Sequence, residues 1–536
     1  MSSVAAESLN HSATVRPSLE RRHASGTILL FLALLALGVA YTSYSLVSDI
    51  GSTAHPMTLL PFLLLGVALL IALGFEFVNG FHDTANAVAT VIYTHSLPPH
   101  FAVVYSGTLN FLGVLFSSGA VAFGIISLLP VELILQVGSS AGFAMVFALL
   151  IAAILWNLGT WWLGLPASSS HTLIGSIIGV GVANALMHGR DGTSGVDWAQ
   201  ATKIGWSLLI SPLVGFVCAG LLLLVLRAVV RNPALFREPR GRAAPPGWIR
   251  GILILTCGGV SFAHGSNDGQ KGMGLIMLIL IGTVPMAYAL NRAMPKDEMI
   301  PFIAMATTTQ QSLQKYASVA VPDDPRAALS AYVRTHSWSE SLVPALAAVT
   351  GSIAEQVKAR GSFAQLPAEA VTNVRNDMYL TSEVVRLLGK DAHARGFDAE
   401  TTSNLAAFKK QIDRATKFIP LWVKVAVAIA LGLGTMVGWK RIVVTIGEKI
   451  GRTHLTYAQG ASAELVAMST IAAADMFGLP VSTTHVLSSG VAGTMAANRS
   501  GLQMTTLRNL AVAWVLTLPA AIVLSGVLYW LFRQIF

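Results

Sequence analysis

The sequence predicts an all-α polytopic membrane protein with a 5+5 inverted repeat, interrupted helices and an extra N-terminal span. Of its 536 residues, 54% are apolar and only 11% are charged, whereas a soluble domain carries about 25% charged residues. Apolar segments of about 20 residues recur along the chain, and each is long enough to cross ~30 Å of hydrocarbon as a helix. Two polar motifs also occur twice. This composition excludes a soluble enzyme.

The net charge of +9 reflects arginine clusters between apolar segments. Such clusters set the orientation of membrane proteins, so we expect a lipid bilayer around the chain and no nucleic-acid partner. The two cysteines, Cys218 and Cys257, lie in or beside apolar segments and have no C-x-x-C spacing. We therefore expect no cysteine metal site and no redox site.

Eleven apolar segments are predicted to cross the membrane once each. They are 27–47, 57–93, 101–129, 140–162, 171–188, 204–228, 251–290, 420–438, 458–478, 483–497 and 507–533. The first is longer than the roughly 7–15 apolar residues of a cleaved signal peptide, so we expect it to be retained. A cytoplasmic N-terminus places the basic clusters within 227–250 and 440–452 inside, in agreement with the positive-inside rule. The same count places residues 291–419 outside.

Residues 291–419 differ from the rest of the chain because they hold 28 of its 61 charged residues. Their helical periodicity, interrupted by prolines and a glycine, predicts a small helical domain without metal-ligand spacing or a phosphate-binding loop. The predicted divisions of the chain are 1–56 (tail and extra helix), 57–228 (first repeat), 229–250 (basic cytoplasmic linker), 251–290 (first helix of the second repeat), 291–419 (polar helical insert) and 420–536 (remainder of the second repeat).

The repeat is visible in two pairs of motifs. Residues 79–87 (NGFHDTANA) match 264–272 (HGSNDGQKG) at an offset of 185, and 164–171 (GLPASSSH) match 478–485 (GLPVSTTH) at an offset of 314. The offsets differ by 129, the length of the insert. Five crossings in each half would orient the halves oppositely, an architecture frequent among secondary transporters.

The first motif pair places Asp83 and Asp268 inside apolar segments. A carboxylate there costs at least ~2.5–3.5 kcal/mol unless it is paired or lines a polar cavity, which makes both residues functional candidates. A structural ion pair or a helix cap is the alternative. We expect the preceding glycines, Gly80 and Gly265, to let the helix unwind and expose backbone groups to a ligand.

Two further positions of this motif differ between its copies. Lys271 occupies the position of Asn86, three residues after the aspartate and on the same helix face. Its ammonium either binds an anion or neutralises Asp268. His82 occupies the position of Asn267, and its imidazole either moves protons or is a structural hydrogen-bonding group.

The second motif pair opens two helices with consecutive hydroxyl groups. They are Ser168, Ser169 and Ser170 in the first copy and Ser482, Thr483 and Thr484 in the second. Free N–H groups and the positive end of the helix dipole bind oxyanions at such positions. Simple N-capping is the alternative, although a cap needs only one hydroxyl. Both segments are therefore candidate anion-binding sites.

Three other acids lie in apolar segments: Glu76, Glu464 and Asp475. Each either carries a cation or proton or forms a local pair. Adjacent serine and histidine also suggest a hydrolase, but a catalytic triad needs one asymmetric set of residues and this chain has two copies. An anion or proton channel with the same polar lining is a further alternative.

Together these motifs resemble the inorganic phosphate transporter (Pit) family. The segments 78–94 and 447–460 (GEKIGRTHLTYAQG) are similar to its bacterial low-affinity branch, and the resemblance covers roughly 57–290 and 420–536. It implies a secondary active symporter of the bacterial inner membrane rather than an enzyme. The imported species would be inorganic phosphate, as a neutral complex with Mg²⁺ or another divalent cation, driven by protons. Sodium drives other branches, and arsenate is expected to compete.

The resemblance also implies roles for individual residues. By the resemblance, phosphate is expected to bind Asp83, Asn86, Asp268, Ser168, Ser169, Ser170, Ser482, Thr483 and Thr484. The residue pattern described above adds Lys271 to the phosphate site, and it places protons or the coupling ion at His82, Asn267, Glu76, Glu464 and Asp475. His82 and Lys271 depart from the family's usual asparagines, which weighs against sodium coupling. No permanently bound cofactor is expected, and a homo-oligomer is compatible with this reading.

Overall fold

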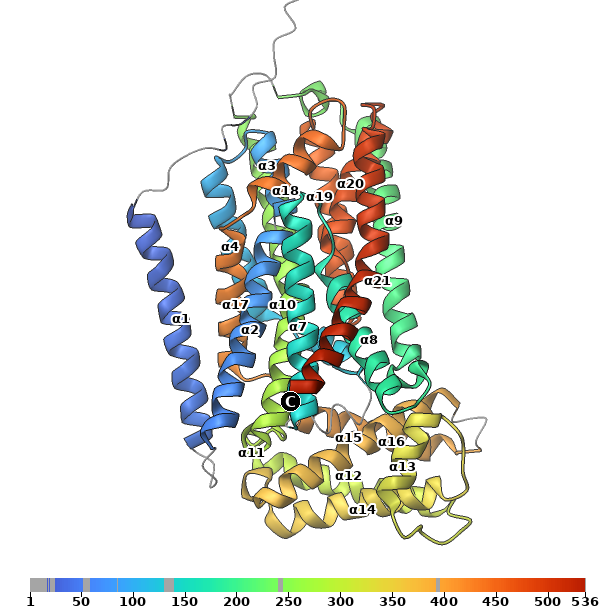
Figure 1. Cartoon of the computed structure of the whole chain (residues 1–536). Coiled ribbons are helices and arrows are strands. Elements are labelled where there is room, and N and C mark those ends of the chain that lie inside the picture. The colour runs from blue at the N-terminus through green and yellow to red at the C-terminus, as the bar shows by residue number, and fades with distance from the viewer. Residues whose placement is uncertain are drawn as a thin grey trace, which may run out of the picture.

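The computed structural model describes residues 17, 19, 25–51, 58–83, 85–129, 139–239, 244–391 and 396–535. In these ranges the chain forms helices and no β-strand, so the all-α prediction is confirmed. A tall bundle of near-parallel helices carries a smaller group of helices at one end (Figure 1).

The tall bundle contains the following helices in chain order: α1 (Ser25–Gly51), α2 (Leu59–Asp83), α3 (Ala85–Tyr93), α4 (Pro99–Phe116), α5 (Ala120–Ile126), α7 (Ser140–Trp162), α8 (Ser169–Met187), α9 (Trp198–Val229), α10 (Gly247–Thr283), α17 (Leu421–Thr435), α18 (Lys440–Val444), α19 (Tyr457–Met476), α20 (Thr483–Ala497) and α21 (Met504–Ile535).

Seven spans of the described chain, α1, α2 with α3, α4, α7, α8, α9 and α21, are long and apolar enough to cross a membrane. An eighth is formed if α17 and the preceding helix α16 (Ala399–Thr416) are counted as one bent span. The protein is therefore a multi-pass membrane protein. The predicted total of eleven also counts α10, α19 and α20. These helices contain polar motifs or are shorter, which explains why hydropathy alone does not detect them.

Helix pairing is compatible with the predicted inverted repeat. The fourth helix of the first repeat, α8, packs on the last helix of the second, α21, and α20 packs on α9 in the same way. Similarly, α4 packs on α10 while α17 packs on α2. Both α9 and α21 have 32 residues and an internal proline, Pro212 or Pro519.

The motif glycines allow close helix packing. A Cβ at Gly80 would lie 2.3 Å from the Leu431 carbonyl oxygen, and a Cβ at Gly265 would lie 2.2 Å from that of Asn110. The expectation that Gly265 interrupts its helix is wrong, because α10 is continuous from Gly247 to Thr283. In the first copy, α2 remains helical through Gly80 and ends only at Asp83.

The extra helix α1 lies along one side of the bundle and packs on α17 (Figure 1). Gly38 contacts Ile429 there. Near its end, Asp49 accepts hydrogen bonds from Tyr288 (2.6 Å) and Trp422 (3.1 Å). These bonds attach α1 to the chain on both sides of the insert.

The insert forms its own helical group below the bundle, at the end away from the start of α1 (Figure 1). Its helices are α12 (Lys296–Gln314), α13 (Pro325–Thr335), α14 (Leu342–Arg360), α15 (Ala368–Asp391) and α16 (Ala399–Thr416). The buried ring of Phe302 contacts Phe363 and Phe408 at centroid distances of 5.5 and 5.8 Å. The insert thus has an aromatic centre of its own.

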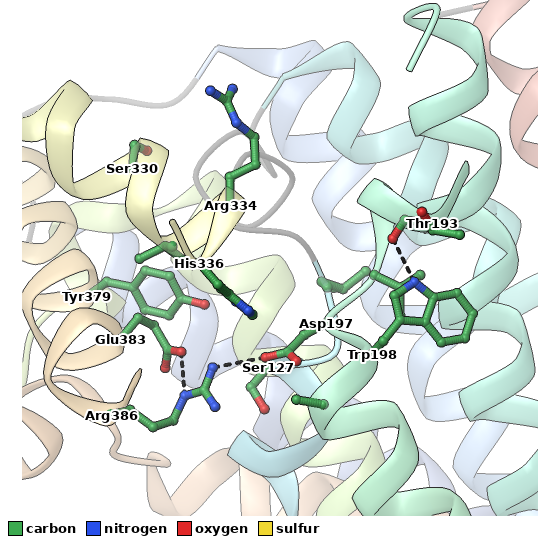
Figure 2. A pocket seen from close by; sticks show the side chains of 14 residues that line it. Ser127, Thr193, Asp197, Trp198, Ser330, Arg334, His336, Tyr379, Glu383 and Arg386 are labelled. Carbon is green, nitrogen blue, oxygen red and sulfur yellow. Dashed lines mark hydrogen bonds and ion pairs between the residues drawn. The ribbon is translucent and has the colours of Figure 1, made fainter. Parts of the chain in front are cut away.

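A cavity of about 400 Å³ lies between α13 and α15 of the insert and the start of α9 (Figure 2). Arg386 of α15 crosses this boundary and pairs with Asp197, the N-cap of α9, at 2.9 Å and with Glu383 at 2.7 Å. Burial lowers the pKa of Arg386, but both carboxylates raise it, and the result lies above the ordinary value. The arginine therefore remains charged and holds the insert against α9.

Candidate functional site

The two hydroxyl-rich motifs meet inside the bundle because α8 and α20 both begin there. Each helix follows a short non-helical segment, 163–168 or 477–482. The rings of His171 and His485, in the first turns, lie 4.7 Å apart, and His485 stacks on Trp514 at 4.2 Å. The two copies of the hydroxyl-rich motif therefore meet at the N-termini of α8 and α20.

The first hydroxyl of each motif is an N-cap. Ser168 Oγ accepts a hydrogen bond from the His171 backbone N–H at 3.2 Å, and Ser482 Oγ accepts one from His485 at 3.1 Å. Capping thus accounts for one hydroxyl in each copy. Of the other four hydroxyls, those of Ser169, Ser170 and Thr484 donate to groups outside their own helix.

Asp83 joins both helix starts. Its carboxylate accepts hydrogen bonds from Ser169 of α8 and from Thr484 of α20, the latter at 2.9 Å. Ser169 Oγ also lies 2.8 Å from Asn79 Oδ1, and His82 Nδ1 lies 2.8 Å from Asp83 Oδ1. All these side chains are buried. One carboxylate at the end of α2 is therefore bonded to residues from both halves of the chain.

Asp268 has a different partner. The ammonium of Lys271, one turn later on α10, lies 2.6 Å from Asp268 Oδ2, and both side chains are fully buried. Lys271 also donates to Ser170 Oγ, which donates to the Val481 carbonyl oxygen at 2.7 Å. The ion pair thus contacts the start of α8 and the segment before α20.

His264 lies between the two aspartates. One ligand atom each from Asp83, His264 and Asp268 lie within 4.8 Å of one another, a group able to hold a metal ion. His264 Nδ1 lies 3.0 Å from Asn110 Oδ1, and its Nε2 lies 3.5 Å from Asp268 Oδ2. A second partner that orients the ring is typical of metal-binding histidines.

Asn267 and Thr483 complete the α20 side of the site. The Asn267 amide donates to the Leu479 carbonyl oxygen at 3.1 Å and accepts from the Val481 N–H at 3.4 Å, which holds the segment before α20. Thr483 Oγ1 is buried and has no hydrogen-bond partner within the described part of the chain. It is therefore the hydroxyl available to a ligand.

The three other predicted acids form different contacts. Glu76 is buried against Gly272, next to Lys271, and accepts from Asn79 at 3.4 Å. Glu464 accepts hydrogen bonds from Thr90 and from Thr256, the latter at 2.5 Å.

Asp475 binds residues of the second motif on α10. Its carboxylate accepts from Ser266 at 2.6 Å and from Gln270 Nε2 at 2.5 Å. Of the three acids, Glu76 alone adjoins the Lys271 ion pair, whereas Glu464 and Asp475 bind neighbouring polar residues.

Most candidate residues therefore lie at one buried centre. The structure brings together Asp83, Asp268, Lys271, Ser169, Ser170 and Thr484, with His82, Asn267, Glu76 and Thr483 beside them. The side chain of Asn86 lies outside the described residues. Sequence reasoning missed His264 and Asn79. The i, i+4 spacing of His264 and Asp268 on one helix face was the available signal for the histidine.

The centre combines groups for an anion and for a cation. Two helix N-termini, a free hydroxyl and an ammonium suit an oxyanion, while two carboxylates and an imidazole suit a cation. Residues 79–525, which include every motif described above, match the phosphate transporter family.

The chain belongs to the phosphate transporter family.

Full-length relatives agree with this membership. The low-affinity inorganic phosphate transporter PitA of Escherichia coli K12 is 43% identical over 491 residues, covering 88% of this chain and 97% of PitA. A probable low-affinity inorganic phosphate transporter of Bacillus subtilis is 26% identical, with 88% and 99% covered. The sequence resemblance is thus confirmed, and membership is of a transporter family rather than an enzyme family.

A structural comparison aligns the chain with a solved structure described as the sodium-dependent phosphate transporter. That comparison gives a TM-score of 0.49 at 20% identity and covers 88% of this chain and 100% of the other.

Proposed function

We propose that this member of the phosphate transporter family is a secondary active symporter that imports inorganic phosphate with protons, as a complex with a divalent cation such as Mg²⁺. The observation that carries the proposal is the junction at Asp83. This residue of the first repeat is hydrogen-bonded to Ser169 and Thr484, at the starts of α8 and α20. Relative movement of the two repeats would change the contact between Asp83 and Thr484, whereas Asp83 and Ser169 lie in the same repeat and would move together.

The anion would bind at the two helix starts. Backbone N–H groups and the positive dipole ends of α8 and α20 converge there and favour an oxyanion. Thr483 Oγ1 supplies a free donor. The ammonium of Lys271 is bonded to Asp268 and Ser170 and adds positive charge beside the helix starts. A tetrahedral phosphate can accept hydrogen bonds from several of these groups at once. Arsenate has nearly the same shape and charge, so we expect it to compete.

The two buried carboxylates are the reason for proposing a divalent cation at the site. Asp83 and Asp268 would repel a phosphate anion, and Lys271 is close enough to neutralise only part of this charge. A divalent cation between the phosphate and the group Asp83, His264 and Asp268 would remove the repulsion, with oxygen and imidazole ligands that such cations accept. Protons are expected to travel with the complex through the buried acids and His82.

Uptake into proteoliposomes tests the proposal. Purified protein would be reconstituted, a proton or a sodium gradient imposed separately, and radioactive phosphate uptake followed with and without Mg²⁺. We expect accumulation with the proton gradient and Mg²⁺. Accumulation driven only by sodium would contradict proton coupling, accumulation without divalent cation would contradict the metal complex, and flux that never exceeds equilibrium would indicate a channel.

A further inference from the structure

Lys271 stands where the repeat predicts a neutral side chain. At the offset of 185 that aligns Asp83 with Asp268, position 271 corresponds to position 86, which is Asn. One half of the chain therefore has an amide and the other a lysine at equivalent positions. No other position within the aligned nine residues replaces an uncharged side chain by a lysine or arginine.

The surroundings of the ammonium are those of a bound monovalent cation. Its ligands are oxygens: Asp268 Oδ2 at 2.6 Å and Ser170 Oγ. Ser170 is oriented by its own bond to the Val481 carbonyl oxygen, and the Glu76 side chain packs on Gly272, the next residue of α10. The lysine is fully buried. A buried ammonium is stable only when such oxygens replace its water.

We infer that Lys271 is a built-in cation, which occupies the place of a mobile monovalent cation in the second repeat and makes phosphate uptake independent of sodium. The inference rests on the proposed symport and names the residue that determines its ion specificity. The ammonium is tethered to α10, so it stays in the protein through the transport cycle. Only the remaining cation and the phosphate would then cross the membrane.

The alternative role for Lys271 is a direct bond to phosphate. The two roles differ in whether added small cations restore phosphate uptake after Lys271 is replaced. A phosphate-binding lysine loses affinity on substitution, whatever the small cations present. A built-in cation leaves an empty oxygen-lined site that sodium, lithium or ammonium can fill, whereas choline is too large.

The test uses Lys271→Asn, which introduces the residue found in the first repeat. Uptake would be measured in proteoliposomes under the same proton gradient, with either sodium or choline as the main cation. We expect wild-type uptake to differ less than about twofold between these salts. The variant should be slow in choline and about tenfold faster in sodium, equivalent to about 1.4 kcal/mol. Lys424→Asn is the matched control, because Lys424 of α17 is a half-buried lysine bonded to the Ser117 carbonyl oxygen.

Each outcome decides the inference. A slow variant that sodium, lithium and ammonium all fail to accelerate would overturn it and favour the phosphate bond. If wild type accumulates no phosphate, the proposed function fails instead, and melting of the purified variant still tests the inference, because sodium should raise the melting temperature of Lys271→Asn and not that of wild type.

A variant that does not fold is also informative. If Lys271→Asn is not recovered from the membrane, the double variant with Asp268→Asn removes the cation and its carboxylate together and should be recovered. Loss of both proteins would overturn the inference.

Discussion

The two copies of the aspartate motif occupy corresponding places in the repeat but differ in structure. In the first copy Asp83 ends α2, and its carboxylate is hydrogen-bonded to hydroxyls from α8 and α20. In the second copy Asp268 lies inside the continuous helix α10 and pairs with the ammonium of Lys271. The first carboxylate thus connects α2 with the starts of α8 and α20, while the second is paired with a lysine of its own helix. The two aspartates thus keep corresponding positions in the repeat, but their different neighbours give them different contacts.

The largest expected effects come from removing either carboxylate, and these should separate the two copies. Asp83→Asn and Asp268→Asn should both reduce phosphate uptake to background. Their stabilities should differ, because Asp268→Asn leaves a buried ammonium without a carboxylate, which costs about 3–5 kcal/mol. Asp83→Asn weakens hydrogen bonds to hydroxyls and should cost about 1–3 kcal/mol. Uptake and melting temperature of the purified proteins would be measured together.

The double variant Asp268→Asn with Lys271→Gln is the control for this comparison. It should regain most of the stability lost in Asp268→Asn while remaining inactive. Equal melting temperatures for the two single variants would contradict the difference between the copies.

The second-largest effect on stability is expected from the motif glycines, which should tolerate no side chain. Gly80→Ala and Gly265→Ala place a methyl group within 2.3 Å of the Leu431 carbonyl oxygen and 2.2 Å of the Asn110 carbonyl oxygen, respectively. We expect each to cost about 1–3 kcal/mol or more, since backbone must move. Gly74→Ala on α2 and Gly251→Ala on α10 are matched controls with nothing within 4 Å. Similar melting temperatures for all four variants would exclude close packing as the role of the motif glycines.

A smaller effect should distinguish capping from ligand binding at α20. Thr483→Val removes a buried hydroxyl that has no hydrogen-bond partner in the described structure, so phosphate affinity should fall about tenfold with little change in stability. Ser482→Ala removes the N-cap and should cost about 1 kcal/mol of stability. Binding and melting measurements on both variants test this, and an unchanged affinity in Thr483→Val would count against the helix-start site.

The smallest effect on uptake should come from the insert. Arg386→Gln breaks the partly exposed ion pairs with Asp197 and Glu383, which contribute no more than about 1 kcal/mol. Uptake should change less than twofold, whereas limited proteolysis of the insert should become faster. Loss of uptake in this variant would show that the insert takes part in transport.

The sequence predicted the fold class and most of the central residues, since the hydropathy, the motif copies and their offsets are all visible in it. Pairing of residues far apart in the chain was not visible. The bonds of Asp83 to Thr484 and of Lys271 to Ser170 depend on how the repeats pack, and local spacing does not encode that packing. The role of Gly265 was misjudged because a glycine that unwinds a helix and one that admits a neighbouring helix look alike in sequence.

The central claim is that both repeats build one shared phosphate site, and binding stoichiometry tests it most directly. Phosphate binding to purified protein would be titrated calorimetrically, with Mg²⁺ present, for wild type, Asp83→Asn and Asp268→Asn. We expect one phosphate per chain in wild type and no measurable binding in either variant. Two phosphates per chain in wild type, with one retained in each variant, would show two independent sites and contradict the account.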